Sequence, residues 1–218
     1  MSLKLNFKIA VISIDDFYLP SEEMKLAIKN NPWNVSRGFP GSHSVNLMHE
    51  KLMHWKINGE LNVPVFDKSL RNGLGDRSHW RRDYPDLLII EGWFLGIQPF
   101  SSDVKSQYIN FPYLNPLESS YILKIQKNLN KYLDVWNLID NIWHLKPLRF
   151  EYMNMWKINQ EKDMLLQKGN ALQDEKLSNF LRMLNVSIPQ KSFDFINSYA
   201  LLLINQERNL VEASLNSY

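Results

Sequence analysis

The stretch KIAVISIDDFYLP at residues 8–20 decides the fold class of this protein. Its first seven residues, 8–14, are apolar and rich in β-branched side chains, and the run stops at Asp15 and Asp16. A second run, LLII at residues 87–90, stops in the same way at Glu91. Short apolar runs of this kind are typical of strands that are buried on both faces, as in a parallel sheet covered by helices. The run YALLLI at residues 199–204 is a third predicted strand.

Helical patterns lie between and after these strands. Between the first two, apolar residues recur on one helical face at Val45, Met48, Leu52 and Trp55, and serine caps are available at positions 42 and 44. Strands separated by a helix favour a βαβ arrangement and an α/β fold.

The clearest helical stripe predicts one long helix over residues 120–145, because apolar residues recur there at spacings of three and four. A second helix is expected over residues 150–167, and Gly169 marks its end. Asp174 is expected to cap a third, shorter helix. The C-terminal half is therefore predicted to be more helical than the N-terminal half.

Composition narrows the possible functions. The chain has 218 residues with 44% hydrophobic side chains, which fits one α/β domain over residues 1–218. It contains no cysteine, so disulfides, zinc–thiolate sites and thiol catalysis are excluded. The net charge of +2 gives no general case for nucleic acid as a partner. No apolar stretch is long enough to span a bilayer, and we expect a cytoplasmic protein without a membrane segment.

The acidic ends of the first two predicted strands are the strongest candidate for chemistry. Asp15, Asp16 and Glu91 would project toward the carboxyl edge of the sheet, where open α/β sheets bind their ligands. Carboxylates that meet there could hold Mg²⁺ or orient a substrate hydroxyl as a general base. The alternative is that these acids only begin turns, as acids at strand ends commonly do.

A basic segment follows at residues 63–82. It opens with VPVFDKS, which contains Asp67 and Lys68, and continues with arginines at positions 71, 77, 81 and 82 and with Gly73 and Gly75. Glycines let backbone amides approach an anion, while Lys and Arg neutralise phosphate or carboxylate charge. The functional interpretation is an anion site, and the alternative is a solvated basic loop. Nucleic-acid binding by residues 71–82 is a third and weaker interpretation.

The loop RGFPGSH at residues 37–43 is a further candidate. Two glycines and a proline indicate a shaped loop, in which Arg37 and His43 could face a small anionic substrate. His49 and His54 lie on the following helix at a spacing of five, which does not place them on one face, and we do not expect them to bind a metal.

Taken together, these segments resemble the D-glycerate 3-kinase family, which is similar to uridine kinases and phosphoribulokinases among the P-loop kinases. The matching pieces occur in the family's order and cover nearly the whole chain. They are ISIDDFYLP (12–20), RGFPGSH (37–43), VPVFDKSLRNGLGDRS (63–78), LLIIEGWFLGI (87–97), IQKNLNKYLDVWNLIDNIWHLKP (125–147), WKINQE (156–161) and INQERNL (204–210).

The resemblance implies a P-loop-kinase-like three-layer fold with a mostly parallel sheet, and transfer of the γ-phosphoryl group of ATP to a hydroxyl of D-glycerate or a similar small acid. Asp15 or Asp16 would accept the hydroxyl proton, and Asp16 and Glu91 would support Mg²⁺. The residues implied around the substrate and the phosphoryl group are Arg37, His43, Asp67, Lys68 and Arg77. Residues 147–190 would form a helical lid, with Lys157 as a charge donor.

One part of the family pattern is not found within residues 1–218. A kinase of this type carries a strand followed by G-x-x-x-x-G-K-[ST] before the DDFYLP segment, and this sequence contains no such motif. We therefore expect the sheet to lack its first, P-loop strand and the chain as printed to be incomplete or inactive. The alternative is a non-catalytic relative that binds a small acid or a protein. An unpaired apolar sheet edge would also favour rearrangement or a homodimer.

Overall fold

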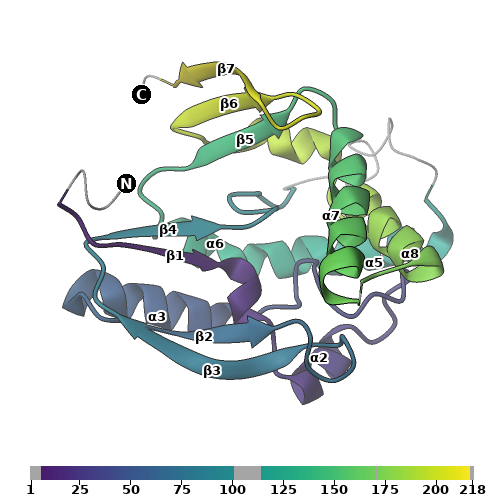
Figure 1. Ribbon diagram of the computed structural model, residues 1–218, viewed down its shortest axis with the longest axis horizontal. Helices are drawn as coiled ribbons and strands as arrows, with labels where there is room; N and C mark the ends of the chain where they lie inside the picture. Colours follow the sequence, from purple (N-terminus) through teal and green to yellow (C-terminus); the bar gives the residue numbers. More distant parts are fainter. Residues whose placement is uncertain (1–5, 101–113, 170, 217–218) are drawn as a thin grey trace. The chain divides into compact units, whose positions relative to one another are not determined.

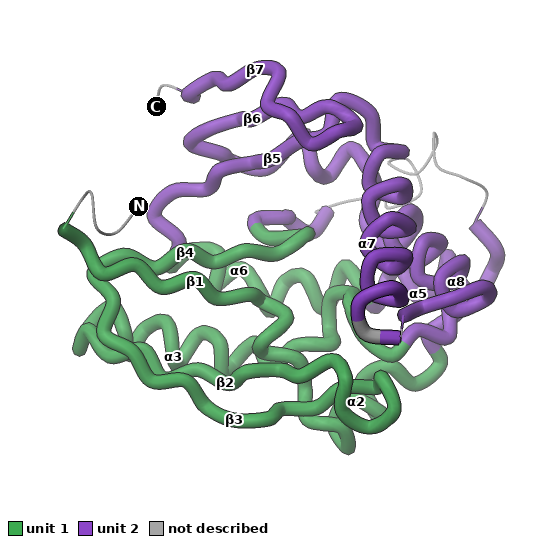
Figure 2. Tube along the Cα trace, in the orientation of Figure 1, with its two compact units in different colours: residues 1–30, 36–95, 125–138 green, residues 31–35, 96–124, 139–218 purple. Residues whose placement is uncertain are grey.

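The computed structural model describes residues 6–100, 114–169 and 171–216 and divides the chain into two compact units (Figure 2). Unit 1 contains Met1–Asn30, Ser36–Leu95 and Ile125–Leu138, and unit 2 contains Asn31–Val35, Gly96–Lys124 and Ile139–Tyr218. Each unit is described by itself. A single domain over residues 1–218, with a lid at residues 147–190, stays a prediction.

The parallel pair predicted from the first two apolar runs is present in unit 1 (Figure 1). Strand β1 (Ile9–Ser13) pairs in parallel with β4 (Leu87–Glu91), in a register that runs from Ile9 opposite Leu87 to Ser13 opposite Glu91. A parallel pair needs a long crossover, and here the connection contains helices and a hairpin. The register brings the carboxyl ends of the two strands side by side, as predicted.

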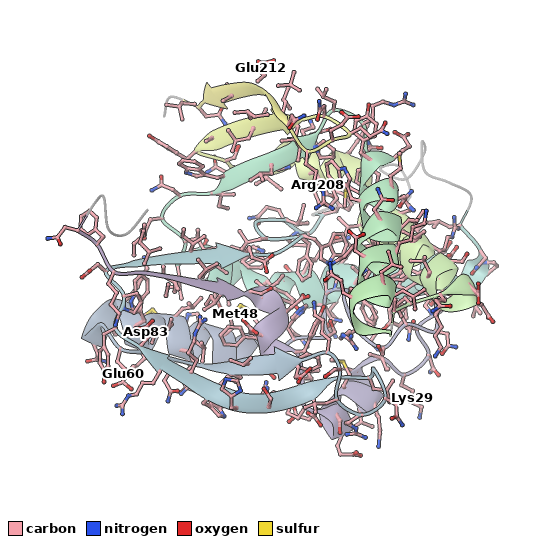
Figure 3. All side chains as sticks on the ribbon, viewed as in Figure 1. Lys29, Met48, Glu60, Asp83, Arg208 and Glu212 are labelled. Atoms are coloured by element: carbon pink, nitrogen blue, oxygen red, sulfur yellow. The ribbon has the colours of Figure 1, made fainter. Side chains whose placement is uncertain are left out.

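The crossover contains helix α2 (Ser21–Ala27) and helix α3 (Val45–Asn58). Val45, Met48 and Leu52 of α3 are buried, which confirms the predicted apolar face, and Met48 is fully enclosed (Figure 3). Helix α3 ends at Gly59, whose φ of 72° is the left-handed conformation that glycine adopts at helix ends. Ser44 occupies the N-cap position, but its side chain makes no cap hydrogen bond.

A β-hairpin occupies most of the basic segment at residues 63–82, for which an anion site and a solvated basic loop were the alternatives. Strand β2 (Leu61–Asp67) pairs antiparallel with β3 (Asp76–Asp83), with a bulge between Val65 and Phe66. The loop interpretation was wrong because β3, with sequence DRSHWRRD, is almost wholly polar and offers no apolar alternation to detect. Gly73 and Gly75 lie in the turn with φ angles of 87° and 74°.

The single long helix predicted over residues 120–145 was also wrong. Helix α5 (Pro116–Leu129) is followed by the 3₁₀ turn η2 (Asn130–Tyr132) and the short helix α6 (Leu133–Trp136). Residues 143–147 then form strand β5 (Trp143–Pro147). Trp143 continued the helical spacing by coincidence, whereas Trp143 and Leu145 also satisfy the two-residue period of a strand that shows one face to solvent.

Unit 2 holds a three-stranded sheet in the order β5-β6-β7. Strand β6 (Ala200–Ile204) pairs in parallel with β5 and antiparallel with β7 (Leu210–Leu215). The strand predicted at residues 199–204 is therefore confirmed, and the unit's sheet mixes parallel and antiparallel pairs.

Helix α7 (Tyr152–Lys168) matches the helix predicted at residues 150–167 and ends at Gly169, whose φ is 66°. Helix α8 (Asp174–Val186) is also present, but its N-cap is Gln173 and not Asp174. The 3₁₀ helix η3 (Gln190–Phe195) precedes β6. The cap prediction failed because Asp174 already lies inside the first helical turn.

The core of unit 1 is rich in aromatic side chains. Phe94 packs edge-on against Tyr132 and Trp136, at centroid distances of 5.3 and 6.2 Å. Phe17 and Phe39 are also fully buried. Each such ring contributes about 1.5–3 kcal/mol by leaving water, so this cluster is a main stabilising element of the unit.

Unit 2 contains an ion pair whose carboxylate is buried. Arg182 donates to both oxygens of Glu118 at 2.8 and 2.7 Å, and Trp33 Nε1 donates to Glu118 Oε1 at 3.0 Å. Because the carboxylate is almost fully buried, these donors offset the loss of water around its charge.

The prediction that β1 and β4 are buried on both faces was wrong, because side chains on one face, namely Val11, Leu87 and Ile89, are exposed. Self-association through a sheet edge stays a prediction. Within the described ranges, none of the helices has the length and apolar character needed to span a bilayer.

Candidate active site

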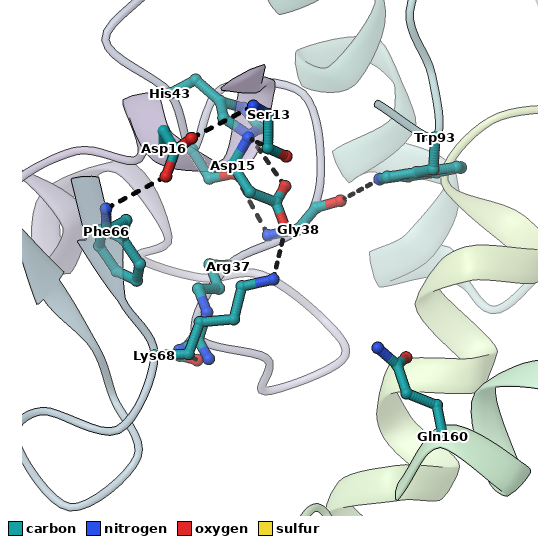
Figure 4. Close-up of polar contacts among 12 residues, drawn as sticks. Ser13, Asp15, Asp16, Arg37, Gly38, His43, Phe66, Lys68, Trp93 and Gln160 are labelled. Carbon is teal, nitrogen blue, oxygen red and sulfur yellow. Dashed lines mark hydrogen bonds and ion pairs between the residues drawn. The ribbon is translucent and has the colours of Figure 1, made fainter. Parts of the chain in front are cut away.

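Two adjacent aspartates follow strand β1 and have different partners. They lie in the 3₁₀ helix η1 (Ile14–Phe17), for which Ser13 is the N-cap. Ser13 Oγ accepts a hydrogen bond from the Asp15 amide at 3.1 Å, and Asp16 Oδ2 accepts one from the Ser13 amide at 3.2 Å. This reciprocal capping box fixes the backbone, so the two carboxylates point in different directions (Figure 4).

The Asp16 carboxylate accepts hydrogen bonds from backbone amides. Its second oxygen, Oδ1, accepts a hydrogen bond from the Phe66 amide at 3.3 Å. Phe66 lies where the register between β2 and β3 shifts, because Ser78 of β3 has no partner residue on β2. Asp16 therefore ties the end of β1 to β2 with both of its oxygens.

Asp15 carries the charge of the site. Lys68 Nζ lies 2.7 Å from Asp15 Oδ2, and His43 Nε2 lies 3.8 Å from Asp15 Oδ1. The Asp15 side chain keeps 26% of its surface exposed, so it can meet a ligand. Burial by itself would raise the pKa of Asp15, but His43 and the charge of Lys68 outweigh it and hold this pKa well below its usual range. Asp15 is therefore an accessible, ionised carboxylate.

His43 lies beneath this carboxylate and is buried. Its ring stacks on Tyr18 at a centroid distance of 4.5 Å, and its Nδ1 lies 2.9 Å from Tyr132 Oη. Burial lowers the pKa of His43 although Asp15 acts in the opposite direction, so the imidazole is neutral at neutral pH. Burial and the neighbouring Asp15 raise the pKa of Tyr18, which stays a phenol.

The loop at residues 37–43 is held by side chains from other elements of unit 1. Trp93 Nε1 donates to the Gly38 carbonyl at 2.7 Å, and Asn128 Nδ2 donates to the Pro40 carbonyl at 3.2 Å. Gly41, with a φ of 106°, donates its amide hydrogen to Tyr132 Oη at 3.0 Å. These bonds fix the position of His43.

The two arginines predicted to surround the substrate hold backbone carbonyls. Arg37 Nη1 donates to the carbonyls of Gly73 and Leu74, at 3.1 and 2.7 Å. Arg77 Nε donates to the Tyr18 carbonyl at 3.2 Å, and its Nη2 donates to Ser44 Oγ at 2.7 Å. Arg37 and Arg77 thus fasten the hairpin turn, strand β3 and the loop together. Substrate binding by either stays a prediction.

Asp67 organises the turn that presents Lys68. Asp67 Oδ1 accepts hydrogen bonds from the Ser69 amide at 2.8 Å and from Ser69 Oγ at 2.6 Å. This is an Asx-type turn at the end of β2. Asp67 therefore positions Lys68, and direct contact of Asp67 with a ligand stays a prediction.

Glu91 ends strand β4 opposite Ser13, so it stands beside the start of η1. Within residues 6–100, 114–169 and 171–216, no hydrogen bond or ion pair engages its carboxylate. Gly92 follows, and a Cβ there would collide with the side chain of Ile14. The two strand ends therefore lie side by side, whereas a meeting of the Glu91 carboxylate with those of Asp15 and Asp16 stays a prediction.

Lys157 belongs to unit 2 and is engaged there. Its Nζ lies 2.5 Å from Glu161 Oε1 and 4.8 Å from the centroid of the Phe180 ring. Glu161 is buried, and its Oε2 accepts a hydrogen bond from the Leu172 amide at 2.7 Å. The predicted role of Lys157 as a charge donor in a lid stays a prediction.

Unit 2 also contains a polar hollow of about 430 Å³ between α7 and the turn that joins β6 to β7. Trp156 Nε1 donates to the Gln206 carbonyl at 2.6 Å, and the Arg208 guanidinium lies 5.3 Å from the centroid of the Trp156 ring. Amide side chains complete the lining, among them Asn159, Gln160 and Gln167. Both motifs involved, WKINQE and INQERNL, were noted in the sequence, but nothing local indicated that they meet.

The structure adds one site residue that sequence reasoning missed. Tyr132 was assigned to a helical core stripe, and its ring is indeed fully buried. Its hydroxyl, however, reaches His43 and Gly41. The only available signal was that a tyrosine stood in a stripe otherwise suited to apolar side chains.

A divalent metal finds a limited set of ligands in the described residues. No three His, Asp or Glu side chains among them gather in a way that could hold an ion. Both oxygens of Asp16 accept backbone hydrogen bonds, whereas the Glu91 carboxylate has no such engagement. Support of Mg²⁺ by Asp16 and Glu91 therefore stays a prediction, for which Glu91 is the carboxylate without another engagement among the described residues.

Comparison with known proteins finds kinases among the relatives of this chain. The chain is 30% identical over 200 residues to the uncharacterized kinase mug58 of Schizosaccharomyces pombe, covering 86% of this chain and 70% of that protein. It is 32% identical over 187 residues to the chloroplastic D-glycerate 3-kinase of Arabidopsis thaliana, covering 80% of this chain but only 39% of that enzyme.

The chain belongs to the D-glycerate 3-kinase family. A solved D-glycerate 3-kinase from Cryptococcus neoformans superimposes with a TM-score of 0.86 at 26% identity, over 99% of this chain and 82% of that one. Phosphoribulokinase from Rhodobacter spheroides shares the fold, with a TM-score of 0.51 at 11% identity over 94% of this chain and 63% of that one. The predicted α/β fold of the P-loop kinases is therefore confirmed. No protein-family model matches the chain.

Proposed function

We propose that this member of the D-glycerate 3-kinase family transfers the γ-phosphoryl group of ATP to a hydroxyl of D-glycerate or a similar small hydroxy acid. The observation that carries the proposal is the pair formed by Asp15 and Lys68 at the carboxyl end of β1, beside the end of β4. An accessible carboxylate next to an exposed cation suits an acceptor that has both a hydroxyl and a negative charge.

Asp15 accepts the proton of the attacking hydroxyl. As the oxygen of the acceptor bonds to the γ-phosphorus and the bond to the leaving phosphate oxygen breaks, the hydroxyl proton passes to the Asp15 carboxylate. The lowered pKa of Asp15 makes it a weak base. This is tolerable because phosphoryl transfer has a loose transition state, in which the proton leaves late and positioning matters more than base strength.

The ammonium group of Lys68 neutralises the negative charge of the substrate. In the substrate-free protein it pairs with Asp15, and its side chain is 53% exposed. An incoming carboxylate or phosphate competes for the same ammonium group, and moving Lys68 away from Asp15 raises the basicity of Asp15. Substrate binding would in this way prepare the base. His43, which presents a buried nitrogen to the same place, contributes hydrogen bonding and no charge.

Glu91 is the residue that would hold Mg²⁺, through water, together with the phosphates of the nucleotide. Bound there, the ion would neutralise phosphate charge as it develops. The absence of other engagements of Glu91 among the described residues supports this role.

The hollow of unit 2 offers flat and amide-bearing side chains, which suit a purine ring. Trp156 and Arg208 provide stacking surfaces, and the amides of Asn159 and Gln160 provide donors and acceptors. These properties support ATP as the phosphoryl donor.

A second candidate function is binding of a small acid without phosphoryl transfer. The observation in its favour is that residues 1–218 contain no G-x-x-x-x-G-K-[ST] motif to cradle the β- and γ-phosphates. The two candidates share the acceptor site and differ only in whether ADP is formed.

Two measurements separate them. Calorimetry with D-glycerate is expected to detect binding, and D-lactate, which lacks the 3-hydroxyl, is the matched acceptor control. A coupled assay for ADP with MgATP and each acid then tests transfer. ADP formation that needs D-glycerate and is absent with D-lactate supports the kinase, while binding without ADP supports the second candidate. No binding of either acid at millimolar concentration contradicts both.

A further inference from the structure

Tyr132 has a hydroxyl group in a fully buried position with two polar neighbours. Its ring is fixed by Phe94, edge-on at 5.3 Å, and by Trp136, stacked at 5.4 Å. The Gly41 amide donates to Tyr132 Oη at 3.0 Å, and His43 Nδ1 lies 2.9 Å from the same oxygen. The hydroxyl therefore cannot turn to solvent, and it must donate its single hydrogen to one of these neighbours.

The direction of the hydrogen bond to His43 follows from these contacts. Burial raises the pKa of Tyr132, so the phenol keeps its hydrogen. The Gly41 amide is a donor and can only be bound by the oxygen lone pair. His43 Nδ1 is then the remaining polar neighbour that can accept the phenol hydrogen. If Nδ1 donated instead, the phenol hydrogen would be buried without an acceptor among the described residues, which is costly.

The surroundings of His43 Nε2 also indicate that Tyr132 donates its hydrogen to His43 Nδ1. His43 Nε2 is buried and has no hydrogen-bond partner within the part of the chain that the structure describes. It lies 3.8 Å from Asp15 Oδ1, which is too long for a hydrogen bond. A bare Nε2 lone pair would repel the ionised carboxylate, whereas an Nε2–H attracts it.

We infer that Tyr132 is a positioning residue that holds His43 as the neutral tautomer with its hydrogen on Nε2. This inference deepens the proposed function and rests on it for the identity of the ligand. The Nε2–H is a buried donor that faces Asp15 Oδ1 at 3.8 Å, so it holds the Asp15 carboxylate in position by electrostatic attraction. Asp15, which keeps part of its surface exposed, is the group that meets the acceptor.

A neutral donor suits this site better than a cation. An imidazolium would form a second ion pair with Asp15, in addition to that of Lys68, and would weaken the carboxylate further as a base. By supplying a hydrogen to Nδ1, Tyr132 lets the buried His43 position the Asp15 carboxylate without adding charge.

The test is a long-range ¹H–¹⁵N correlation spectrum of the protein with ¹⁵N-labelled histidine. The chain has five histidines, and His43→Gln assigns the resonance of interest. The expected spectrum of His43 shows a protonated Nε2 and an unprotonated, hydrogen-bonded Nδ1. Tyr132→Phe removes only the hydroxyl, and the Nδ1 resonance is expected to move to the position of a nitrogen without a donor.

Tyr121→Phe is the matched control, because Tyr121 is another buried tyrosine and belongs to unit 2. It is expected to leave the His43 resonances unchanged. Calorimetry on the same samples is expected to show a dissociation constant for D-glycerate that is roughly 5-fold higher in Tyr132→Phe. This is the size of effect expected from the loss of one hydrogen bond. Thermal unfolding of each variant establishes that the compared samples are folded.

The outcomes are distinct. A hydrogen on Nδ1 in the wild-type protein, or a Tyr132→Phe spectrum equal to that of the wild type, overturns the inference. If Tyr132→Phe fails to fold, the wild-type spectrum still decides, because it reports the tautomer directly. If the tautomer is as expected but neither D-glycerate nor any other hydroxy acid binds, the proposed function fails while the role of Tyr132 in fixing His43 stands.

Discussion

Lys68 Nζ lies 2.7 Å from Asp15 Oδ2, although the two residues are 53 positions apart in the chain. The hairpin formed by β2 and β3 brings this cation to the end of β1, and the Asx turn at Asp67 holds the backbone just before it. An acidic residue at the end of a strand commonly does no more than begin a turn. Here the ammonium group of Lys68, which comes from the hairpin, lowers the pKa of the Asp15 carboxyl and makes this strand end a candidate site.

Asp15→Asn is expected to abolish the function while leaving the fold intact. The amide cannot accept the hydroxyl proton, and general-base catalysis is worth roughly 10²–10⁴-fold in rate. The coupled ADP assay measures the loss, and circular dichroism checks the fold. Activity within threefold of the wild type would show that Asp15 is not the base.

Asp16→Ala should affect stability more than Asp15→Ala does. It removes a carboxylate that accepts hydrogen bonds from the amides of Ser13 and Phe66. Loss of this capping and bridging interaction is expected to cost about 1–3 kcal/mol of the free energy of unfolding. Urea denaturation of the two alanine variants gives the comparison. Equal destabilisation by the two substitutions would contradict the structural role assigned to Asp16 and not to Asp15.

Lys68→Met is expected to raise the pKa of Asp15 toward its ordinary value. Removal of the ammonium group leaves burial as the main influence on the carboxyl, and burial raises its pKa. Carbon-13 NMR of the Asp15 carboxyl during an acid titration measures the change. Lys25→Met, at a surface lysine that pairs only with Glu22 among the described residues, is the control and should leave Asp15 unchanged.

Stability should fall as the pH drops below about 6.5, the ordinary pKa of histidine. The pKa of folded His43 is lowered by burial, so below pH 6.5 the unfolded chain binds a proton that the folded chain does not. The loss continues until the pH reaches the folded pKa, with a slope of at most about 1.4 kcal/mol per pH unit for one proton. Burial lowers the pKa of His144 in the same direction, so it adds to the effect.

Urea denaturation between pH 7.5 and 5 of the wild type, His43→Gln and His144→Gln tests this pH dependence. Each substitution should make the dependence shallower. Asp15 acts in the more acidic range, where its lowered pKa means that stability is lost as the pH falls below about 3.9. A wild-type stability that is constant from pH 7 to 5 would contradict the burial of neutral histidines.

Gly41→Ala is expected to destabilise unit 1 by about 1–3 kcal/mol. Gly41 has a φ of 106°, and an added Cβ would collide with the side chain of Asn128. Gly59→Ala is the matched control, since Gly59 also has a positive φ, of 72°, but open space around it. Thermal unfolding should rank Gly41→Ala as clearly the more damaging. Equal effects would mean that backbone strain alone decides.

Local pattern predicted part of the fold well. The strands around residues 9–13, 87–91 and 200–204 were recognisable because each is a short continuous apolar run, although β1 and β4 are not buried on both faces as the sequence predicted. The apolar face of α3 was equally clear. The hairpin strand β3 and strand β5 were missed because their side chains are polar or half exposed, and only pairing with a neighbour makes them strands.

By itself, the sequence determined that acidic residues end two neighbouring parallel strands and that the chain carries the motifs of a kinase family. Only the tertiary structure decided that Asp15 meets Lys68 while Asp16 holds backbone amides, and that a core tyrosine orients His43. The reason is physical: the identical side chains of Asp15 and Asp16 acquire different roles from partners 50 or more residues away, namely Lys68 and Phe66, and Tyr132 reaches His43 across 89 positions. Such long-range contacts leave no local signature in the sequence.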